Sequence, residues 1–357
     1  MNKVRVGIVG MGNIVMNWAH MNDYRKVEEC EIVAICDIDE AKLKATGDEL
    51  GIPENRRFTD YNDLIACEDV DVVDIATWNS VHCEIAEAVA RAGKTFSVEK
   101  PVGMNYGEVK KLADVVKETG VDSFVCLSWR YRPYTRYLKY LIAEGKIGKL
   151  YHMYIRCIKD SGLWEGRKRE WRFDDSRAGS GVLGDLGSHM IDIAHFWGQK
   201  FKEVYATRGI FITERPSEET GEIVPVDTDD WANIIAKMED DTSCTISVSR
   251  TATTVPDLIQ FEVYGETGKL IYTHLAGEQT IEYVDNATKE REWLTPPEEF
   301  AKANQSQSFI DLANGKTDEY TATLEHGLEC QAVIDAALIS CNENRPVTIK
   351  EVIESAQ

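Results

Sequence analysis

The chain has 357 residues, of which 43 % are hydrophobic and 28 % are charged, close to the average of globular proteins. At about 150 residues per domain, this length predicts two domains, each with its own core. The 61 acidic and 40 basic residues give a formal net charge of −21, which would repel nucleic acid or an anionic membrane over most of the surface. We therefore expect a soluble, folded protein with neither of these partners.

The cysteines and the N-terminal residues indicate in which cellular compartment the protein is found. Nine cysteines are scattered from Cys30 to Cys341 without a Cys-x-x-Cys pair, which fits neither a disulfide framework nor a zinc ribbon and is typical of a reducing compartment. The start of the chain imitates a signal peptide, but the polar Asn13 and Asn17 and the lack of an Ala-x-Ala site argue against one. No apolar run approaches the roughly 20 residues that span a bilayer. The sequence therefore predicts a cytoplasmic protein.

From Lys3 to about Leu150, short β-rich runs alternate with longer segments of helical period, the pattern of a parallel sheet wrapped by helices. We expect a doubly wound Rossmann domain over residues 1–128. The expected strands are Val4–Val9, Glu31–Cys36, Val70–Ala76, Thr95–Val98 and Ser123–Ser128. The expected helices, each ending near a glycine, are Ala41–Leu50, Val81–Ala92, Tyr106–Glu118 and Tyr134–Glu144.

After Tyr151, strand-like runs follow one another with turns between them, which predicts a large, mostly antiparallel sheet in an α+β domain over residues 129–357. This domain is expected to bind substrate and to form oligomers. The expected strands are Met153–Ile158, Val204–Ile212, Asn233–Met238, Cys244–Ser249, Ile259–Tyr264 and Lys269–His274. The expected helices are Gly181–Phe196, after the first strand, and Phe309–Leu312 and Glu325–Cys341, which close the chain and are free to pack back on both domains. Because so few helices cannot cover both faces of this sheet, we expect one face to meet another copy, in a homodimer or homotetramer.

A phosphate-binding loop follows the first strand. In Gly10-Met11-Gly12-Asn13-Ile14-Val15, two glycines let the backbone approach a pyrophosphate, which free amides at a helix N-terminus then bind. The second strand ends at Asp37, where an acid accepts hydrogen bonds from the ribose hydroxyls and repels a 2′-phosphate. The sequence therefore predicts NAD rather than NADP, with an ordinary tight turn as the alternative. Because Val15 stands where the fingerprint has Gly or Ala, we expect the first helix to stand slightly farther from the sheet.

Three further segments carry a resemblance to a known family. Thr77-Trp78-Asn79-Ser80-Val81-His82 and Glu99-Lys100-Pro101 follow successive strands, and Gly179-Ser180-Gly181-Val182-Leu183-Gly184-Asp185-Leu186-Gly187-Ser188-His189-Met190-Ile191-Asp192 opens the helix of the second domain. Together with the glycine loop, in this order, they make the chain resemble the glucose-fructose oxidoreductase, inositol dehydrogenase and rhizopine-catabolism (Gfo/Idh/MocA) family over essentially its whole length. The resemblance implies an NAD-dependent oxidoreductase.

The resemblance also implies a catalytic group of Lys100, Asp185 and His189, which would contact the substrate as well. In the family, the lysine of Glu-Lys-Pro lies beside the nicotinamide, and the Asp and His of Asp-x-Gly-x-His come from the other domain. The chemistry agrees, because a hydride leaves an alcohol carbon only if a base takes the hydroxyl proton, and histidine has an ordinary pKa of about 6.5. On a helix, Asp185 would share a face with His189 and orient its ring. Lys100 would donate to the hydroxyl oxygen and stabilise its developing charge.

The resemblance also implies which further residues contact the cofactor and the substrate. The cofactor would be contacted by Gly10, Gly12, Asn13, Ile14, Asp37, Thr77, Trp78, Asn79, His82, Glu99, Lys100, Trp171 and Arg172, with Trp78 where proline is usual. Trp129 and Arg130 follow the last strand of the first domain, at the sheet edge where ligands bind, and are expected to contact a polyhydroxylated ring. Trp164 is expected either to stack against the same substrate ring or, equally, to pack in the interior of the protein.

Two clusters of charged residues allow other interpretations, as a metal site and as a contact for an anion or another subunit. Asp185, His189, Asp192 and His195 form a stripe along one helix that could hold zinc or manganese, but one short helix rarely supplies a full coordination shell, and no metal is expected. The basic island Gly166-Arg167-Lys168-Arg169 could meet an anionic substrate or another subunit. A solvated loop that balances Glu165 and Glu170 is the favoured interpretation.

The expected function is the NAD-dependent oxidation of a secondary ring hydroxyl of a pyranose sugar, glycoside or cyclitol. The stretches 211–216 and 226–230 resemble those of relatives that oxidise sugars at ring carbon three. Two alternatives remain: a glycoside hydrolase that uses bound NAD for transient oxidation, and a sugar-sensing regulator without turnover. Retention of Lys100, Asp185 and His189 argues against the regulator.

Overall fold

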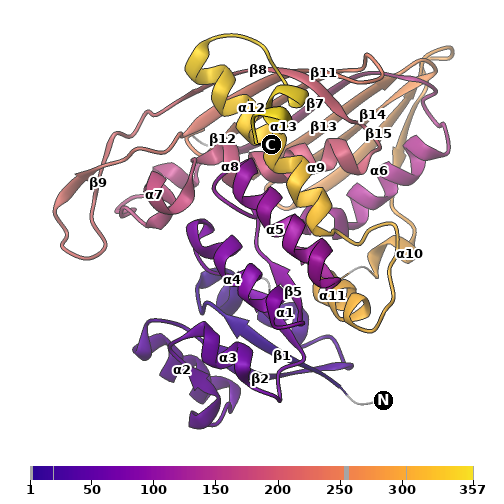
Figure 1. Cartoon of the computed structure of the whole chain (residues 1–357). Helices are drawn as coiled ribbons and strands as arrows, with labels where there is room; N and C mark the ends of the chain where they lie inside the picture. Colours follow the sequence, from indigo (N-terminus) through magenta and orange to yellow (C-terminus); the bar gives the residue numbers. More distant parts are fainter. Residues whose placement is uncertain (1–2, 19, 253–256, 303, 357) are drawn as a thin grey trace. The chain divides into compact units, whose positions relative to one another are not determined.

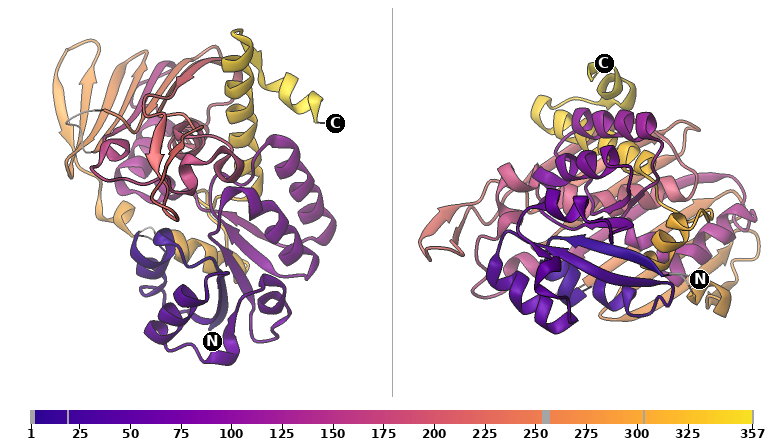
Figure 2. Two further views of the ribbon diagram at one scale, coloured as in Figure 1. Left: turned by 90° about the vertical axis from the view of Figure 1, so that its left-hand side faces the viewer. Right: turned by 60° about the horizontal axis from the view of Figure 1, so that its bottom comes forward.

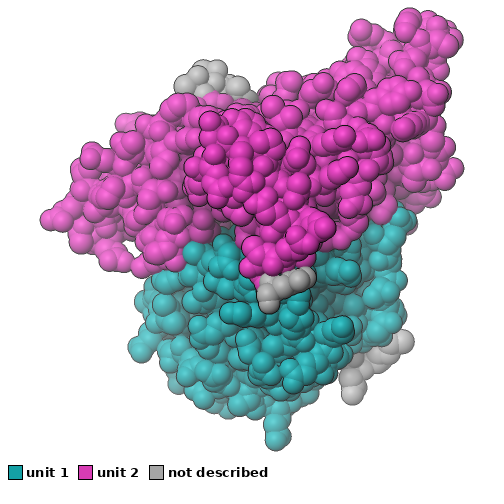
Figure 3. All heavy atoms as spheres, turned by 45° about the horizontal axis from the view of Figure 1, so that its top comes forward, with its two compact units in different colours: residues 1–127, 303–328 teal, residues 128–302, 329–357 magenta. Residues whose placement is uncertain are grey.

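The computed structural model describes residues 3–18, 20–252, 257–302 and 304–356, with the side chains of residues 17 and 18 left out. The chain forms two compact units (Figures 1 and 3). Unit 1 comprises residues 1–127 and 303–328, and unit 2 comprises residues 128–302 and 329–357. A boundary near residue 128 therefore separates the units, except that a late segment of the chain returns to unit 1.

Unit 1 contains a six-stranded parallel sheet in the order β3-β2-β1-β4-β5-β6. Its strands are β1 (Val4–Val9), β2 (Cys30–Cys36), β3 (Arg57–Phe58), β4 (Val72–Ile75), β5 (Thr95–Val98) and β6 (Ser123–Val125). This order, with a reversal between β1 and β4, is the doubly wound Rossmann arrangement, and the expected fold class is confirmed. The sequence did not predict β3, which has only two residues. β6 ends three residues earlier than expected, and the last residue of the expected strand, Ser128, instead begins a 3₁₀ turn, η3 (Ser128–Tyr131).

The helices of unit 1 begin and end at residues that explain their limits. They are α1 (His20–Tyr24), α2 (Glu40–Leu50), α3 (Tyr61–Ala66), α4 (Asn79–Arg91), α5 (Tyr106–Thr119) and α11 (Gln305–Ala313), with a short π-helix η1 (Ile14–Trp18) and a 3₁₀ turn η2 (Glu54–Arg56). The Asp39 and Asn105 side chains accept hydrogen bonds from the first turns of α2 and α5, and both helices end at a glycine with positive φ, Gly51 and Gly120. The predicted glycine stops are therefore correct for these two helices.

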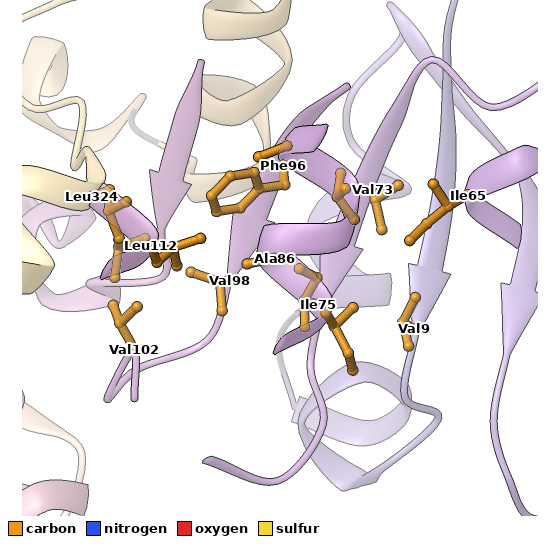
Figure 4. Close-up of a cluster of buried hydrophobic side chains, with 14 of the residues drawn as sticks. Val9, Ile65, Val73, Ile75, Ala86, Phe96, Val98, Val102, Leu112 and Leu324 are labelled. Atoms are coloured by element: carbon orange, nitrogen blue, oxygen red, sulfur yellow. The ribbon is translucent and has the colours of Figure 1, made fainter. Parts of the chain in front are cut away.

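The core of unit 1 joins strands, helices and the returning segment (Figure 4). Phe96 and Val98 of β5 and Ala86 of α4 are completely buried in one apolar cluster, and Leu324 joins them from the returning segment. The Val125 amide donates to the Ala322 carbonyl at 2.8 Å. The returning segment thus covers the edge strand β6, whose backbone would otherwise be unpaired there.

Unit 2 is built on a nine-stranded sheet in the order β16-β15-β14-β13-β7-β12-β11-β8-β17. The strands are β7 (Leu150–Lys159), β8 (Phe201–Gly209), β11 (Trp231–Met238), β12 (Ser243–Ser249), β13 (Asp257–Gly265), β14 (Gly268–Leu275), β15 (Glu278–Asp285), β16 (Arg291–Leu294) and β17 (Val347–Thr348). β7 and β12 are parallel, and the other neighbours are antiparallel. The expected mostly antiparallel sheet is confirmed, with three more strands than the sequence predicted.

A separate hairpin of β9 (Glu214–Pro216) and β10 (Ile223–Pro225) was also not predicted. It projects beyond the large sheet in Figures 1 and 2. The helical elements of unit 2 are α6 (Pro133–Ala143), α7 (Asp175–Ala178), α8 (Val182–Asp185), α9 (Gly187–Phe196), α10 (Glu298–Ala301) and α13 (Ile349–Ser355), with 3₁₀ turns η4 (Ser161–Leu163) and η5 (Trp171–Phe173). α12 (Leu324–Glu343) begins in unit 1 and continues in unit 2.

The helix expected over Gly181–Phe196 is divided into α8 and α9, which meet at Leu186. The start of α8 is fixed by Asp229, whose carboxylate accepts hydrogen bonds from the Gly181 amide at 3.0 Å and the Leu183 amide at 2.9 Å. A Cβ on Gly181 would lie 2.0 Å from the Asp229 carbonyl oxygen. Only glycine therefore allows this close contact between backbones.

The two faces of the large sheet differ. α8 and α9 contact β7, β11 and β12 on one face, where alternate residues such as Ile155 and Ile246 are buried. The opposite face exposes Tyr154 and Ile235. Among the described residues, no helix is both long and apolar enough to cross a bilayer, and each of the nine cysteines, all of which are described, is a free thiol.

Candidate active site

The glycine loop after β1 has the geometry that a dinucleotide requires. Gly10 has a φ of +99°, and a Cβ at this position would lie 2.4 Å from the Ala76 carbonyl oxygen. A Cβ on Gly12 would meet no atom within 4 Å. The first glycine is thus required by the fold, whereas the second leaves open space beside the loop amides, where a phosphate could approach the backbone.

Val15, which replaces the third glycine of the dinucleotide-binding fingerprint, is accommodated by the local backbone. The loop continues into the π-helix η1, in which the Val15 side chain is completely buried. The Val15 and Met16 amides both lie 3.1 Å from the Gly12 carbonyl oxygen and donate to it. These two bonds close the first turn after the loop, and the π-helix η1 itself is a wider helical turn of a kind that is frequent at functional sites.

Asp37 ties the end of β2 to this loop. One of its carboxylate oxygens accepts a hydrogen bond from the Met11 amide at 2.7 Å, and the other accepts from the Asp39 amide at 2.9 Å. The side chain is half-buried, and a carboxylate has about four acceptor positions. It can therefore still accept hydrogen bonds from ribose hydroxyls, so the loop and the acid together fit a bound dinucleotide.

The loops after β4 and β5 lie at the same edge of the sheet, because the carboxyl ends of parallel strands meet there. Trp78 has φ −79° and ψ 149°, a conformation that proline would also adopt, so the tryptophan changes the side chain but not the backbone path. The buried His82 ring lies 3.0 Å from the Pro101 carbonyl oxygen and 3.2 Å from that of Thr77. His82 thus joins the two loops, and burial lowers its pKa.

Lys100 lies between two anchored neighbours. The Glu99 amide donates to the Ile75 carbonyl at 2.9 Å, and the Glu99 carboxylate accepts from the Lys100 amide at 3.1 Å. The Lys100–Pro101 peptide bond is cis. The backbone of the predicted catalytic lysine is therefore held at the carboxyl end of β5, in the same unit as the glycine loop and Asp37.

Sequence reasoning missed a buried polar cluster next to this lysine. His20 Nδ1 lies 2.6 Å from Asp74 Oδ2, and His20 Nε2 lies 2.9 Å from Glu99 Oε1. The Tyr24 hydroxyl donates to Asp74 at 3.0 Å, and the Cys126 thiol adjoins the His20 ring. One signal was available: Asp74 is a carboxylate within the apolar strand β4, and a buried charge needs a buried partner.

In unit 2, the structure brings together Trp171, Arg172 and Asp185. The Arg172 guanidinium lies 4.4 Å from the centre of the Trp171 ring, and its Nε lies 4.0 Å from Asp185 Oδ2. Asp185 is the last residue of α8, and the half-buried His189 is in the first turn of α9. The acid and the imidazole therefore lie on two successive helices, and the expected single helix does not carry them.

Trp129 and Arg130 were expected to contact substrate, but the structure gives them packing roles. Arg130 is 1 % exposed, and its Nε and Nη2 donate to the Asp192 carboxylate at 2.6–3.0 Å. Trp129 is buried edge-on against Phe261, with the Arg132 guanidinium over its ring. The partners Asp192 and Phe261 lie far along the chain, so no local sequence pattern indicates these contacts.

The possible metal stripe on α9 is occupied by other contacts. Asp192 pairs with Arg130, and His195 Nδ1 lies 3.0 Å from the Gln199 carbonyl oxygen. Burial lowers the pKa of His195 to about 4, and its ring packs edge-on against Phe201. Within the described parts of the chain, these four residues do not bring three ligand atoms together.

The remaining candidates lie in one loop of unit 2. Trp164 is 59 % exposed and donates from Nε1 to Asp160 at 3.2 Å, so it is not an interior residue. In the basic island, Arg167 pairs with Glu170 and Arg169 with Asp174. These local ion pairs agree with the favoured interpretation of a balanced surface loop.

Comparison with known proteins identifies the family. Residues 4–126 match the description "oxidoreductase family, NAD-binding Rossmann fold", and residues 135–271 match "GFO/IDH/MocA C-terminal domain". A levoglucosan dehydrogenase of Pseudarthrobacter phenanthrenivorans is 30 % identical over 292 residues, which cover 77 % of this chain and 74 % of that protein. The chain belongs to the Gfo/Idh/MocA family. It is therefore an oxidoreductase with an NAD-binding Rossmann domain.

Two further relatives extend the likeness of this Gfo/Idh/MocA oxidoreductase over the whole chain. A myo-inositol 2-dehydrogenase of Thermotoga maritima is 25 % identical over 356 residues, covering 98 % of this chain and 100 % of that one. The solved structure of a levoglucosan dehydrogenase in complex with NADH and levoglucosan has a TM-score of 0.88 at 24 % identity, over 98 % and 100 % of the two chains. At this identity, the likeness to the solved structure establishes the fold alone.

Asp37→Ala is expected to weaken the binding of NADH about 10- to 100-fold, because charge-assisted hydrogen bonds are worth roughly 1.5–3 kcal/mol. The Kd is measured by titration of NADH fluorescence. Asp39→Ala is the matched control, because it removes a nearby acid that caps α2. An equal loss of sugar and NADH binding in Asp37→Ala would indicate misfolding and would contradict the assigned role.

Proposed function

We propose that this protein is an NAD-dependent dehydrogenase that oxidises a secondary ring hydroxyl of a pyranose sugar, glycoside or cyclitol. The observation that carries the proposal is the placement of Lys100 on an anchored loop at the same sheet edge as the open glycine loop and Asp37. The relatives named for levoglucosan and myo-inositol support the substrate class, since both are rings that carry secondary hydroxyls.

The proposed chemistry divides the work among three residues. Bound NAD supplies the acceptor for the hydride that leaves the carbinol carbon. A nitrogen of the His189 imidazole takes the hydroxyl proton, so that the carbonyl forms as the C–H bond breaks. The Lys100 ammonium donates a hydrogen bond to the same oxygen and stabilises its developing negative charge. Asp185 stabilises the protonated imidazole.

Among the ring hydroxyls, we propose that carbon three is oxidised. The support is the resemblance of residues 211–216 and 226–230 to stretches of sugar 3-dehydrogenases. These two stretches are joined in the structure, because Asp230 accepts hydrogen bonds from the Phe211 and Ile212 amides at 2.8 Å and pairs with the buried Arg250.

A substrate panel tests the proposed function. Purified enzyme is incubated with NAD and with inositols, free hexoses, levoglucosan and alkyl glycosides, and the products are analysed by mass spectrometry and NMR. We expect one class to lose two hydrogens, with a ketone at ring carbon three. Cleavage of a glycoside without net oxidation would indicate the hydrolase instead. Sugar binding without any turnover would indicate the regulator.

We also propose that the exposed face of the large sheet binds a second copy of the chain. Strand register places Ile235, Thr245 and Tyr154 in one row across β11, β12 and β7, and Ile235 and Tyr154 are 59 % and 37 % exposed. A broad sheet face with such residues is typical of a homo-oligomer contact. The proposal covers a homodimer or a homotetramer.

Sedimentation velocity tests this interface. The wild-type protein is expected to sediment as a dimer or tetramer of the 40.3 kDa chain, and Tyr154→Asp/Ile235→Asp is expected to yield monomers, because unpaired charges would be buried. The control is Thr220→Asp, which adds one charge at an exposed position between β9 and β10, outside the large sheet. A monomeric wild-type protein would refute the proposed contact.

A further inference from the structure

His20 occupies an unusual position for a histidine, between two carboxylates inside unit 1. The residue is 3 % exposed, and Asp74 is completely buried. Its Nδ1 lies 2.6 Å from Asp74 on β4, and its Nε2 lies 2.9 Å from Glu99 at the end of β5. One imidazole therefore joins α1, directly after the glycine loop region, to two strands of the Rossmann sheet.

The hydrogen-bond geometry around this ring favours its doubly protonated form. An ionised carboxylate only accepts hydrogen bonds, so a ring that contacts two ionised carboxylates donates from both nitrogens, which only an imidazolium can do. The other groups that face it are the Tyr24 hydroxyl of α1, which donates to Asp74, and the Cys126 thiol after β6. Burial raises the pKa of Cys126 to about 12, so this thiol is neutral. Burial opposes the charge on His20, but the charge and hydrogen bond of Asp74 raise its pKa well above the ordinary value.

The cluster reaches Lys100 through Glu99. One Glu99 oxygen faces His20, while the other accepts the hydrogen bond of the Lys100 amide at 3.1 Å. Burial tends to raise the pKa of Glu99, but the hydrogen bond and charge of His20 lower it below its usual value. If the imidazolium were lost, Glu99 would be a buried carboxylate without its cation, and such groups move or take up a proton.

We propose that His20 is a positioning residue for Lys100: held between Asp74 and Glu99, it fixes the Glu99 carboxylate and thereby the backbone from which the Lys100 ammonium extends. This inference rests on the function proposed for Lys100. It assigns catalytic importance to a histidine outside the proposed catalytic group.

A metal ion is the competing interpretation of the cluster. Ligand atoms of His20, Glu99 and Cys126 lie within 4.8 Å of one another. However, a metal ligand needs a nitrogen lone pair, and both His20 nitrogens already face carboxylate oxygens at hydrogen-bond distance. The geometry therefore favours the imidazolium.

Two substitutions separate the two halves of the His20 contact. In His20→Gln, the new side-chain amide nitrogen would overlay the position of Nε2 and reach Glu99, whereas in His20→Asn it would overlay that of Nδ1 and reach Asp74. We expect His20→Asn to lower kcat about 10-fold or more, because this variant loses the charge-assisted hydrogen bond to Glu99. The kcat of His20→Gln, which keeps a donor to Glu99, is expected to be much closer to that of wild type. Tyr24→Phe is the control, because it removes a hydrogen bond to Asp74 but leaves both His20 contacts. Its kcat is expected to stay within about two-fold of wild type.

A double-mutant cycle with Lys100→Ala distinguishes failure of this inference from failure of the proposed function. The rates are measured with the panel substrate that wild type oxidises fastest. If His20 acts through Lys100, His20→Asn changes kcat by less than about two-fold in the Lys100→Ala background. Additive losses would overturn the positioning role and leave Lys100 catalytic. An unchanged kcat in Lys100→Ala alone would refute the function proposed for Lys100, and this inference with it.

NMR of the wild-type protein without substrate or cofactor gives a readout independent of activity. Two-bond ¹H–¹⁵N correlations distinguish an imidazolium from a neutral ring, and the His20 signals are assigned with the His20→Gln variant. At about pH 8, above the ordinary histidine pKa of about 6.5, His20 is expected to remain doubly protonated. A neutral ring, or one equivalent of metal in the purified protein by elemental analysis, would overturn the inference.

Discussion

His189→Ala is expected to lower kcat by about two to four orders of magnitude, the usual loss when a general base is removed. The hydroxyl proton then loses its proposed acceptor, the His189 imidazole. The Kd for NADH is expected to change little, because the cofactor contacts proposed for unit 1 remain. Steady-state kinetics and NADH titration of the same preparation measure both quantities.

His152→Ala is the matched control for this prediction. His152 is an exposed histidine on β7, in the same unit as His189, and its replacement is expected to leave kcat within about two-fold of wild type. An undiminished kcat in His189→Ala would exclude this residue as the base. A loss of NADH binding as large as the loss of kcat would attribute the effect to folding.

Asp192→Ala is expected to reduce the free energy of unfolding by about 3–5 kcal/mol, because it leaves the Arg130 guanidinium buried without its counter-ion. Three hydrogen bonds of 2.6–3.0 Å join the two side chains, and neither is more than 2 % exposed. Urea unfolding followed by circular dichroism measures the change.

The control for Asp192 is the double variant Arg130→Met/Asp192→Leu. Replacing a buried ion pair by apolar residues of similar size is often neutral or stabilising, so the double variant is expected to be more stable than Asp192→Ala. A change below about 1 kcal/mol in Asp192→Ala, together with a selective loss of substrate or metal binding, would instead make Asp192 a site residue.

Much of the fold could be predicted because local patterns encode it. Val4–Val9 and Thr95–Val98 have the predicted bounds, since each is a short apolar run with clear limits. β15 and β16 escaped prediction because charged and polar residues interrupt the apolar positions of EQTIEYVD and REWL, and both strands begin with three exposed residues. The return of residues 303–328 to unit 1 depends on contacts such as that between Val125 and Ala322, which are distant in sequence and have no local signal.

The residues of the candidate site also fall into those that the sequence could predict and those that it could not. Gly10 and Asp37 could be found from the sequence because their roles depend on position relative to a strand end. The pairs His20–Asp74, His20–Glu99 and Arg130–Asp192 could not, because their members are 54, 79 and 62 residues apart. A histidine or arginine in isolation does not reveal which carboxylate it will meet after folding. The sequence therefore did not predict the ion pair of Arg130 or the contacts of His20.

The most direct test of the account follows the hydrogen that leaves the substrate. The enzyme is given NAD and its panel substrate with deuterium on the ring carbons, and the NADH and sugar products are analysed by mass spectrometry. We expect one deuterium in NADH for each ketone formed. Ketone formation with the deuterium released to water, or no deuterated NADH from any substrate of the panel, would contradict hydride transfer from a ring alcohol.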